Sequence, residues 1–293
     1  MPGGVATLPG VILAAIALAL AAAALHGTWN VLVKVSGDPL TTFQRATAVG
    51  ALAMAVPALI GWLVTGRPGI NPAAFGFAAI SAVLEVSYLW LLSAAYVRGE
   101  LSVVYPIARG SAPLLSVMIG LIVLGERLGA LQLAGVIVLL AGILAVTLPQ
   151  TSGRATLPAL LTGVAIAVYT AVDRVGVRLT EPWLYGWLLV TMMAIGMAIS
   201  VPIAARIRHE PRRTTAVITW RQSAVIGVVM WAGYLLVLIA LSIAPLAVVA
   251  PVRETAVVAV ALWGVWRLGE RQAAGLKIAG AAATLIGVSL LAI

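Results

Sequence analysis

The feature that most constrains this chain is a succession of long apolar segments separated by short polar interruptions. Ten such segments cover residues 9–34, 40–64, 73–97, 101–124, 129–148, 157–177, 183–205, 220–243, 245–266 and 272–293. About 20 consecutive apolar residues are enough to cross the hydrocarbon core of a bilayer. A chain in lipid must satisfy its backbone hydrogen bonds internally, and these segments lack the alternating pattern of a β-barrel, so each is predicted to be a transmembrane helix.

Composition supports a membrane protein with little chain outside the bilayer. Of the 293 residues, 62% are hydrophobic and only 9% are charged, whereas soluble domains are typically about 25% charged. This balance excludes a soluble enzyme, a nucleic-acid binding protein and a receptor with a large extramembrane head. The sequence contains no cysteine, which removes disulfides, thiolate metal sites and thiol catalysis.

The basic residues predict an orientation. The net charge of +9 comes from 18 Lys and Arg against nine Asp and Glu, and most of the cations stand in short loops, where they are expected to contact anionic lipid headgroups. Loops after odd-numbered segments hold nine of them and loops after even-numbered segments hold four. The positive-inside rule therefore predicts that both termini are periplasmic.

The two halves of the chain repeat each other at an offset of 144 to 145 residues. The matching segments are 102–109 with 247–253 and 125–127 with 269–271. More weakly, and at a slightly smaller offset, 29–34 align with 169–174. Each half holds five segments, and because five is odd the second half must enter the bilayer upside down. The predicted fold is therefore an all-α integral membrane protein with ten transmembrane helices, arranged as two inverted five-helix repeats over 9–148 and 157–293, joined by the linker 149–156. Inverted repeats are typical of secondary transporters, which hold substrate near the membrane midplane between the repeats.

The motifs within these segments resemble those of the EamA family of the drug/metabolite transporter superfamily. They are His-Gly-Thr-Trp-Asn in the first segment, Ser-Val-Val-Tyr-Pro-Ile-Ala-Arg in the fourth, and Gly-Glu-Arg-Leu before the fifth. The resemblance covers essentially the whole chain. It implies ten helices, a bacterial inner-membrane location and export of amino acids or related metabolites, with neutral and aromatic amino acids foremost. The small four-helix drug exporters of the superfamily carry an essential glutamate in helix 1, and this sequence has none there.

Polar and aromatic side chains recur at helical spacing on five segments, so each of these helices presents one polar face. Turned inward, such faces would line a cavity suited to a small zwitterion with an apolar side chain. The predicted cavity residues are His26, Trp29, Asn30, Glu85, Tyr88, Tyr96, Tyr105, Arg109, Tyr169, Asp173, Trp231, Tyr234, Arg253 and Glu254. The rings predicted to form an aromatic box are those of Trp29, Tyr88, Tyr169, Trp231 and Tyr234, with core packing as the alternative. His26 is also a candidate proton sensor, unless it serves only to bond a neighbour.

Charged residues inside the apolar segments are costly in lipid unless they face a cavity or a partner. We expect Arg109 to contact a substrate carboxylate or to pair with Glu85, and Glu254 to pair with Arg253 or Arg45. The alternative is that these residues form fixed ion pairs that hold helices together without touching substrate.

Two further features concern helix geometry. Pro106 and Pro251 occupy matching positions in the fourth and ninth segments, where each removes a backbone hydrogen bond. We predict that they are hinges, with static kinks as the alternative. Glycine pairs seven residues apart in the fifth and tenth segments predict close helix packing outside the transport path, or at a dimer contact.

Together these features predict a secondary transporter that exports small metabolites by alternating access through a central cavity between the repeats. The sequence holds no P-loop, and neither a cofactor nor a metal site is expected. The expected partners are a small-molecule substrate and the lipid bilayer but not nucleic acid, and the expected assembly is a monomer or a weak homodimer. A multidrug exporter or a sugar or nucleotide-sugar carrier of the same superfamily is the alternative. An intramembrane enzyme would need a catalytic set that two His and no Cys leave little to build.

Overall fold

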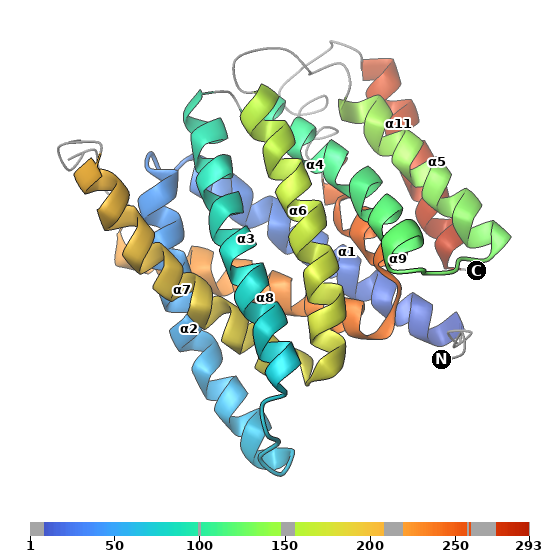
Figure 1. Cartoon of the computed structure of the whole chain (residues 1–293). Helices are drawn as coiled ribbons and strands as arrows, with labels where there is room; N and C mark the ends of the chain where they lie inside the picture. The colour runs from blue at the N-terminus through green and yellow to red at the C-terminus, as the bar shows by residue number, and fades with distance from the viewer. Residues whose placement is uncertain are drawn as a thin grey trace.

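The structure is a computed structural model that describes residues 9–98, 101–147, 156–207, 219–256, 258 and 274–292. The secondary structure of these residues is helical, without a strand (Figure 1). The first half contains α1 (Pro9–Lys34), α2 (Pro39–Val64), α3 (Pro72–Arg98), α4 (Leu101–Met118) and α5 (Ala130–Thr147). The second half contains α6 (Thr156–Gly176), α7 (Pro182–Ile207), α8 (Trp220–Ile243), α9 (Leu246–Arg253) and α11 (Ala274–Leu291). A π-helical turn, η1 (Ile119–Val123), continues α4, and a 3₁₀ turn, η3 (Val177–Leu179), continues α6.

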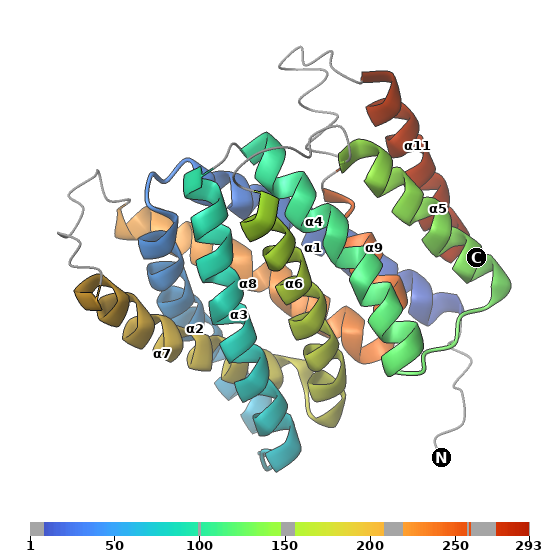
Figure 2. The same ribbon diagram turned by 45° about the horizontal axis from the view of Figure 1, so that its top comes forward.

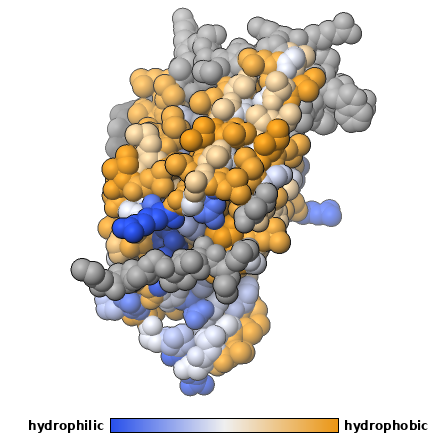
Figure 3. Space-filling model, turned by 90° about the vertical axis from the view of Figure 1, so that its right-hand side faces the viewer, coloured by the Kyte–Doolittle hydropathy of each residue, from blue (hydrophilic) through white to orange (hydrophobic). Residues whose placement is uncertain are grey.

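Seven helices in the described part of the chain are long and apolar enough to cross a membrane: α1, α2, α3, α6, α7, α8 and α11. Shorter apolar stretches lie in α4 with η1 (Gly110–Val123) and in α5 (Ala130–Val146). Large apolar side chains point outward from the bundle, as at Leu52 and Ile122, each 74% exposed. Figure 3 shows a broad hydrophobic area on the side where α5 and α11 lie. Such a continuous apolar surface is unfavourable in water and suits contact with lipid.

The predicted apolar segments agree with the helices to within a few residues, except in the ninth segment. That segment was expected to run from 245 to 266, but α9 ends at Arg253, Glu254 and Thr255 form a turn, and Ala256 and Val258 are helical again. Pro251 stands two residues before this end, and the Glu254 N–H bonds back to the carbonyls of Ala250 and Pro251, which tightens the last turn. The rest of the prediction, at 257 and from 259 onward, lies outside the described residues.

Helices of the first half pack against helices of the second half in five pairs: α1 with α8, α2 with α7, α3 with α6, α4 with α9, and α5 with α11 (Figures 1 and 2). When each helix is replaced by its counterpart in the other half, contacts between helices become other contacts that are also observed. The α1–α8 contact corresponds to α6–α3, α1–α9 to α6–α4, and α2–α8 to α7–α3. This is the pattern expected when a twofold axis relates two structural repeats.

The glycines of α5 and α11 pack against each other within the chain. A Cβ on Gly142 would lie 2.6 Å from the carbonyl oxygen of Gly280, and a Cβ on Gly287 would lie 2.6 Å from the backbone nitrogen of Leu139. Only glycine allows backbones to approach this closely. The predicted close packing is therefore present, and it joins α5 to α11 of the same chain, which lie side by side in Figures 1 and 2.

Candidate functional site

A pocket lies where α1, α3, α6, α7 and α8 meet. Its lining comes from both halves of the chain and consists of His26, Trp29, Glu85, Tyr88, Leu89, Tyr169, Met193, Met230, Trp231 and Tyr234. About 330 Å³ of space is not filled by atoms, open solvent at the mouth included. The room inside the pocket itself is about 20 Å³, enough for about one or two waters. The pocket is thus small in this conformation.

Aromatic rings make up most of the pocket wall. The structure brings together all members of the aromatic box that the sequence predicted, and neighbouring centroids are 5.5 to 6.4 Å apart. The ring contacts run in the order Tyr88–Tyr169–Tyr234–His26–Trp29, with Trp231 against Tyr234. These distances and tilted or edge-to-face angles are favourable for aromatic pairs. The rings therefore pack on each other and line the pocket at the same time.

Glu85, on α3, is the one carboxylate among the residues that line the pocket. It is 5% exposed, and its Oε1 atom has no hydrogen-bond partner among the described residues. The Tyr234 hydroxyl lies next to this carboxylate, and Asp173 and Arg253 are close enough to act on it electrostatically. Glu85 is thus a buried acidic residue, and one oxygen of its carboxyl group is available to bind a ligand.

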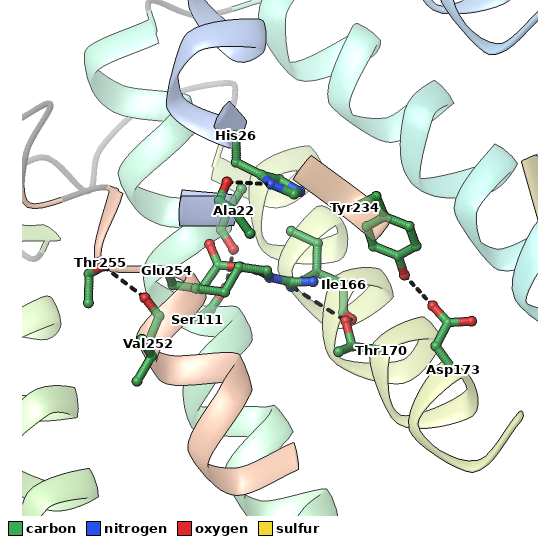
Figure 4. A network of polar contacts seen from close by, with 12 residues as sticks. Ala22, His26, Ser111, Ile166, Thr170, Asp173, Tyr234, Val252, Glu254 and Thr255 are labelled. Atoms are coloured by element: carbon green, nitrogen blue, oxygen red, sulfur yellow. Dashed lines mark hydrogen bonds and ion pairs between the residues drawn. The ribbon is translucent and has the colours of Figure 1, made fainter. Parts of the chain in front are cut away.

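Asp173, on α6, lies behind the pocket wall and accepts hydrogen bonds from two tyrosines. The hydroxyl of Tyr185 donates to its Oδ1 over 2.8 Å. The hydroxyl of Tyr234 donates to its Oδ2 (Figure 4). Gly176 leaves space for Tyr185, because a Cβ there would lie 2.5 Å from the Tyr185 ring. Asp173 does not line the pocket. Its hydrogen bond instead holds Tyr234 in place, and Tyr234 lines the pocket.

Arg253 and Glu254 form a buried ion pair at the end of α9. The Arg253 nitrogens Nη2 and Nε donate to Glu254 Oε1 over 2.9 and 3.0 Å, and Nη2 also lies 3.4 Å from the Thr170 hydroxyl. Adjacent residues on a helix point about 100° apart, yet these two meet because α9 ends at Arg253. This is one of the two pairings predicted for Glu254. The other candidate, Arg45, stacks on the Trp220 ring at 4.8 Å.

Asn30 and Tyr96 lie outside the pocket lining and join α1 to α3. The Tyr96 hydroxyl donates to Asn30 Oδ1 over 2.7 Å, and Asn30 Nδ2 donates to the His26 carbonyl, also over 2.7 Å. His26 Nδ1 donates to the Ala22 carbonyl over 2.9 Å, so the predicted bond to a neighbour is present while the ring still lines the pocket (Figure 4).

Three predicted residues lie on α4. The helix contains Tyr105, Pro106 and Arg109, but their side chains lie outside the described part of the structure. Pro251 lies inside α9. The hinge role of the two prolines and the substrate contact of Arg109 therefore stay predictions.

A second buried polar cluster, which the sequence did not assign to a site, joins the two halves. Glu126 follows η1 in the first half, and its Oε1 accepts a bond from Arg174 Nε over 3.1 Å and from the Leu246 N–H over 2.7 Å. Its Oε2 accepts the Ala247 N–H over 2.9 Å. Arg174 also donates to the carbonyl of Leu241, at the end of α8. Glu126 therefore caps the N-terminus of α9, where unpaired N–H groups and the helix dipole favour an anion.

The only sequence signal for this junction is the repeated Gly-Glu-Arg motif, which marks equivalent positions without showing what they contact. The repeat is also visible in the partners of Lys34 and Arg174, which occupy matching positions. Lys34 Nζ donates to the Tyr96 carbonyl near the end of α3 over 2.6 Å, and Arg174 donates to the carbonyl of Leu241 near the end of α8. Equivalent residues of the two halves thus make equivalent contacts.

Comparison with known proteins agrees with this architecture. The model of the EamA-like transporter family matches residues 13–148 and again residues 154–293. The chain is therefore a multi-pass membrane protein of a transporter class, and it belongs to the EamA-like transporter family. A protein of known crystal structure is similar over 94% of this chain and 97% of its own, with a TM-score of 0.69 and 19% sequence identity, a likeness that shows the fold alone. None of the curated proteins matches the sequence.

Proposed function

We propose that this chain is a secondary transporter that exports small metabolites, neutral and aromatic amino acids foremost, across the bacterial inner membrane by alternating access. The observation that carries the proposal is the pocket, because five of its lining residues come from the first half of the chain and five from the second. Transporters built from inverted repeats hold their substrate at such an interface and expose it to each side in turn. Ten helices in two inverted repeats, 9–148 and 157–293, complete the proposed architecture.

The pocket supplies the contacts that such a substrate needs. Its rings and the side chains of Leu89, Met193 and Met230 offer apolar surface to an apolar side chain, and Glu85 offers a carboxylate. In the proposed cycle, a pocket of this small volume belongs to a closed state. Movement of one half against the other would widen the pocket toward one side of the membrane, and Pro106 and Pro251 are the proposed hinges.

One observation favours a second candidate function, export of cationic drugs. The carboxylate of Glu85 is the one acidic group in the pocket lining, and neither Lys nor Arg is among the described lining residues. A pocket with this charge accepts a cation without a carboxylate as readily as it accepts an amino acid. The two candidate functions differ in whether the cavity binds a substrate that carries a carboxylate.

The experiment uses purified protein in liposomes preloaded with one radiolabelled amino acid at a time, with and without a pH gradient. We expect efflux of phenylalanine or another neutral amino acid above that of protein-free liposomes. Efflux of a cationic dye without flux of any amino acid would replace the first function by the second. The pH-gradient arm shows whether the flux is coupled to protons.

A further inference from the structure

Glu85 is the acidic residue of the pocket lining, and hydrogen bonds within the described protein leave one of its oxygens unsatisfied. Its carboxylate is 95% buried, the Oε1 atom has no hydrogen-bond partner in the described part of the chain, and the side chain lines the pocket. A buried carboxylate without a full set of partners is costly, and more so at membrane depth. A ligand that supplies a positively charged donor to Oε1 therefore gains more than the same ligand would gain in water.

The described side chains nearby leave the Oε1 atom of Glu85 without a hydrogen bond. Arg253 acts on Glu85 electrostatically, but its Nε and Nη2 nitrogens bond to Glu254 and Thr170. His26 shares the pocket, but its Nδ1 proton is directed to the Ala22 carbonyl. On α6, the carboxylate of Asp173 adds a second acidic group close to Glu85. A second acidic group nearby favours a cationic ligand over an anionic one.

The pocket wall is also suited to a cation. Ring faces attract positive charge through their quadrupoles, and a cation within about 6 Å of a ring centroid gains roughly 0.5–2 kcal/mol. The rings of Trp29, Tyr88, Tyr169, Trp231 and Tyr234 surround the same space that Glu85 lines. Several rings around one carboxylate form a site for an ammonium group attached to an apolar body.

We propose that Glu85 binds the ammonium group of the substrate inside this aromatic wall. The assignment rests on the proposed transport function, because the ligand is the transported molecule itself. It makes the amino group the part of the substrate that the described pocket recognises, so that aromatic amines and amino acids bind and aromatic carboxylates that lack an amine do not.

The first test compares three ligands of similar size on the purified wild-type protein by isothermal titration calorimetry. Phenethylamine carries only the amine, 3-phenylpropanoate carries only the carboxylate, and phenylalanine carries both. We expect phenethylamine and phenylalanine to bind and to compete, and phenylpropanoate to bind at least roughly tenfold more weakly, as the loss of a charged hydrogen bond implies. Equal or tighter binding of phenylpropanoate would overturn the proposal.

The second test uses Glu85→Gln, which keeps the shape of the side chain and removes its charge. We expect at least roughly tenfold weaker phenethylamine binding, whereas Glu181→Gln, at an exposed glutamate, keeps the wild-type affinity. Unchanged affinity in Glu85→Gln contradicts the proposal. If that variant fails to fold, the comparison of ligands on the wild-type protein still decides the question.

The two proposals can fail separately. Phenethylamine binding that depends on Glu85, together with absent amino-acid flux in liposomes, would support the ammonium site and contradict amino-acid export. Amino-acid flux that is unchanged in Glu85→Gln would support export and contradict the ammonium site.

Discussion

Two buried glutamates of the first half have opposite surroundings. The side chain of Glu126 is 8% exposed, and its two oxygens accept bonds from Arg174 and from two N–H groups of α9. Glu85 is 5% exposed, lines the pocket and keeps one oxygen without a partner among the described residues. The same side chain therefore has two uses in this fold. A carboxylate whose bonds are satisfied within the protein stabilises the fold, and one with an open oxygen is available to a ligand.

The difference also separates the parts of the proposed cycle. The junction at Glu126 connects the first half to α6, α8 and α9 of the second, so it contributes to how the halves fit together. The pocket at Glu85 lies between the halves and contacts whatever is carried. Substitutions at the junction should change stability first, and substitutions in the pocket should change binding first.

The largest expected effect is that of Glu126→Ala on stability. The substitution leaves the Arg174 guanidinium and two N–H groups of α9 without their acceptor, and breaking a buried ion pair in this way costs about 3–5 kcal/mol. Thermal unfolding of the purified protein should show a clear drop in Tm. Glu181→Ala, at an exposed position, is the matched control and should unfold like the wild type. A Glu126→Ala protein with unchanged Tm would remove the contrast between the two glutamates.

The next effect is that of Glu85→Gln on transport. Loss of one charged hydrogen bond to the substrate corresponds to about 1.5–3 kcal/mol, or roughly a tenfold to hundredfold fall in transport efficiency at low substrate concentration. The Tm should stay close to that of the wild type, since the affected oxygen has no partner to lose. Efflux from liposomes and thermal unfolding are measured on the same preparation. Wild-type efflux combined with a lowered Tm would assign Glu85 to the fold.

A smaller effect is expected for Gly50→Ala, on α2 behind the pocket wall. A Cβ at this position would lie 1.9 Å from Cδ1 of Trp231, so the indole ring must shift. Overpacking of this kind costs about 1–3 kcal/mol, and phenethylamine binding should weaken because the ring lines the pocket. Gly76→Ala is the control, because no atom lies within 4 Å of a Cβ there. Equal affinities of the two variants would show that the placement of Trp231 does not matter for binding.

The smallest effect is expected for Tyr96→Phe. The variant loses the hydroxyl bond to Asn30 on α1, which corresponds to about 1 kcal/mol of stability. Phenethylamine affinity, measured by calorimetry, should remain that of the wild type because neither residue lines the pocket. A marked loss of affinity would extend the binding site along α1 beyond His26.

Much of the helical architecture could be predicted from the sequence because lipid imposes strict rules on a chain. The turn at Glu254 and Thr255 could not be predicted, because Pro251 alone does not show whether a helix bends, breaks or continues. The aromatic residues of the pocket could be predicted from the sequence because they recur at helical spacing on different segments. The same spacing placed Asn30 and Tyr96 in the cavity, where the structure instead shows them bonded to each other.

The role of Glu126 was out of reach of sequence analysis for a different reason. Its partners Leu246 and Ala247 are 120 and 121 residues away, and they contribute backbone N–H groups, which leave no mark in the sequence. Likewise, the partners of Arg174 and Lys34 include backbone carbonyls. Tertiary contacts to the backbone decide which buried charges are satisfied, and therefore which one remains open.

The central claim is that the pocket opens to each side of the membrane in turn. Because the chain has no cysteine, Met230→Cys places a single thiol in the pocket lining, and Leu52→Cys on the outer surface of α2 serves as the lipid-facing control. A charged, membrane-impermeant thiol reagent is added to right-side-out and to inside-out vesicles. Alternating access predicts that Met230→Cys is labelled in both preparations and that phenethylamine slows the labelling, while Leu52→Cys stays unlabelled. Labelling of Met230→Cys from one side only would contradict it.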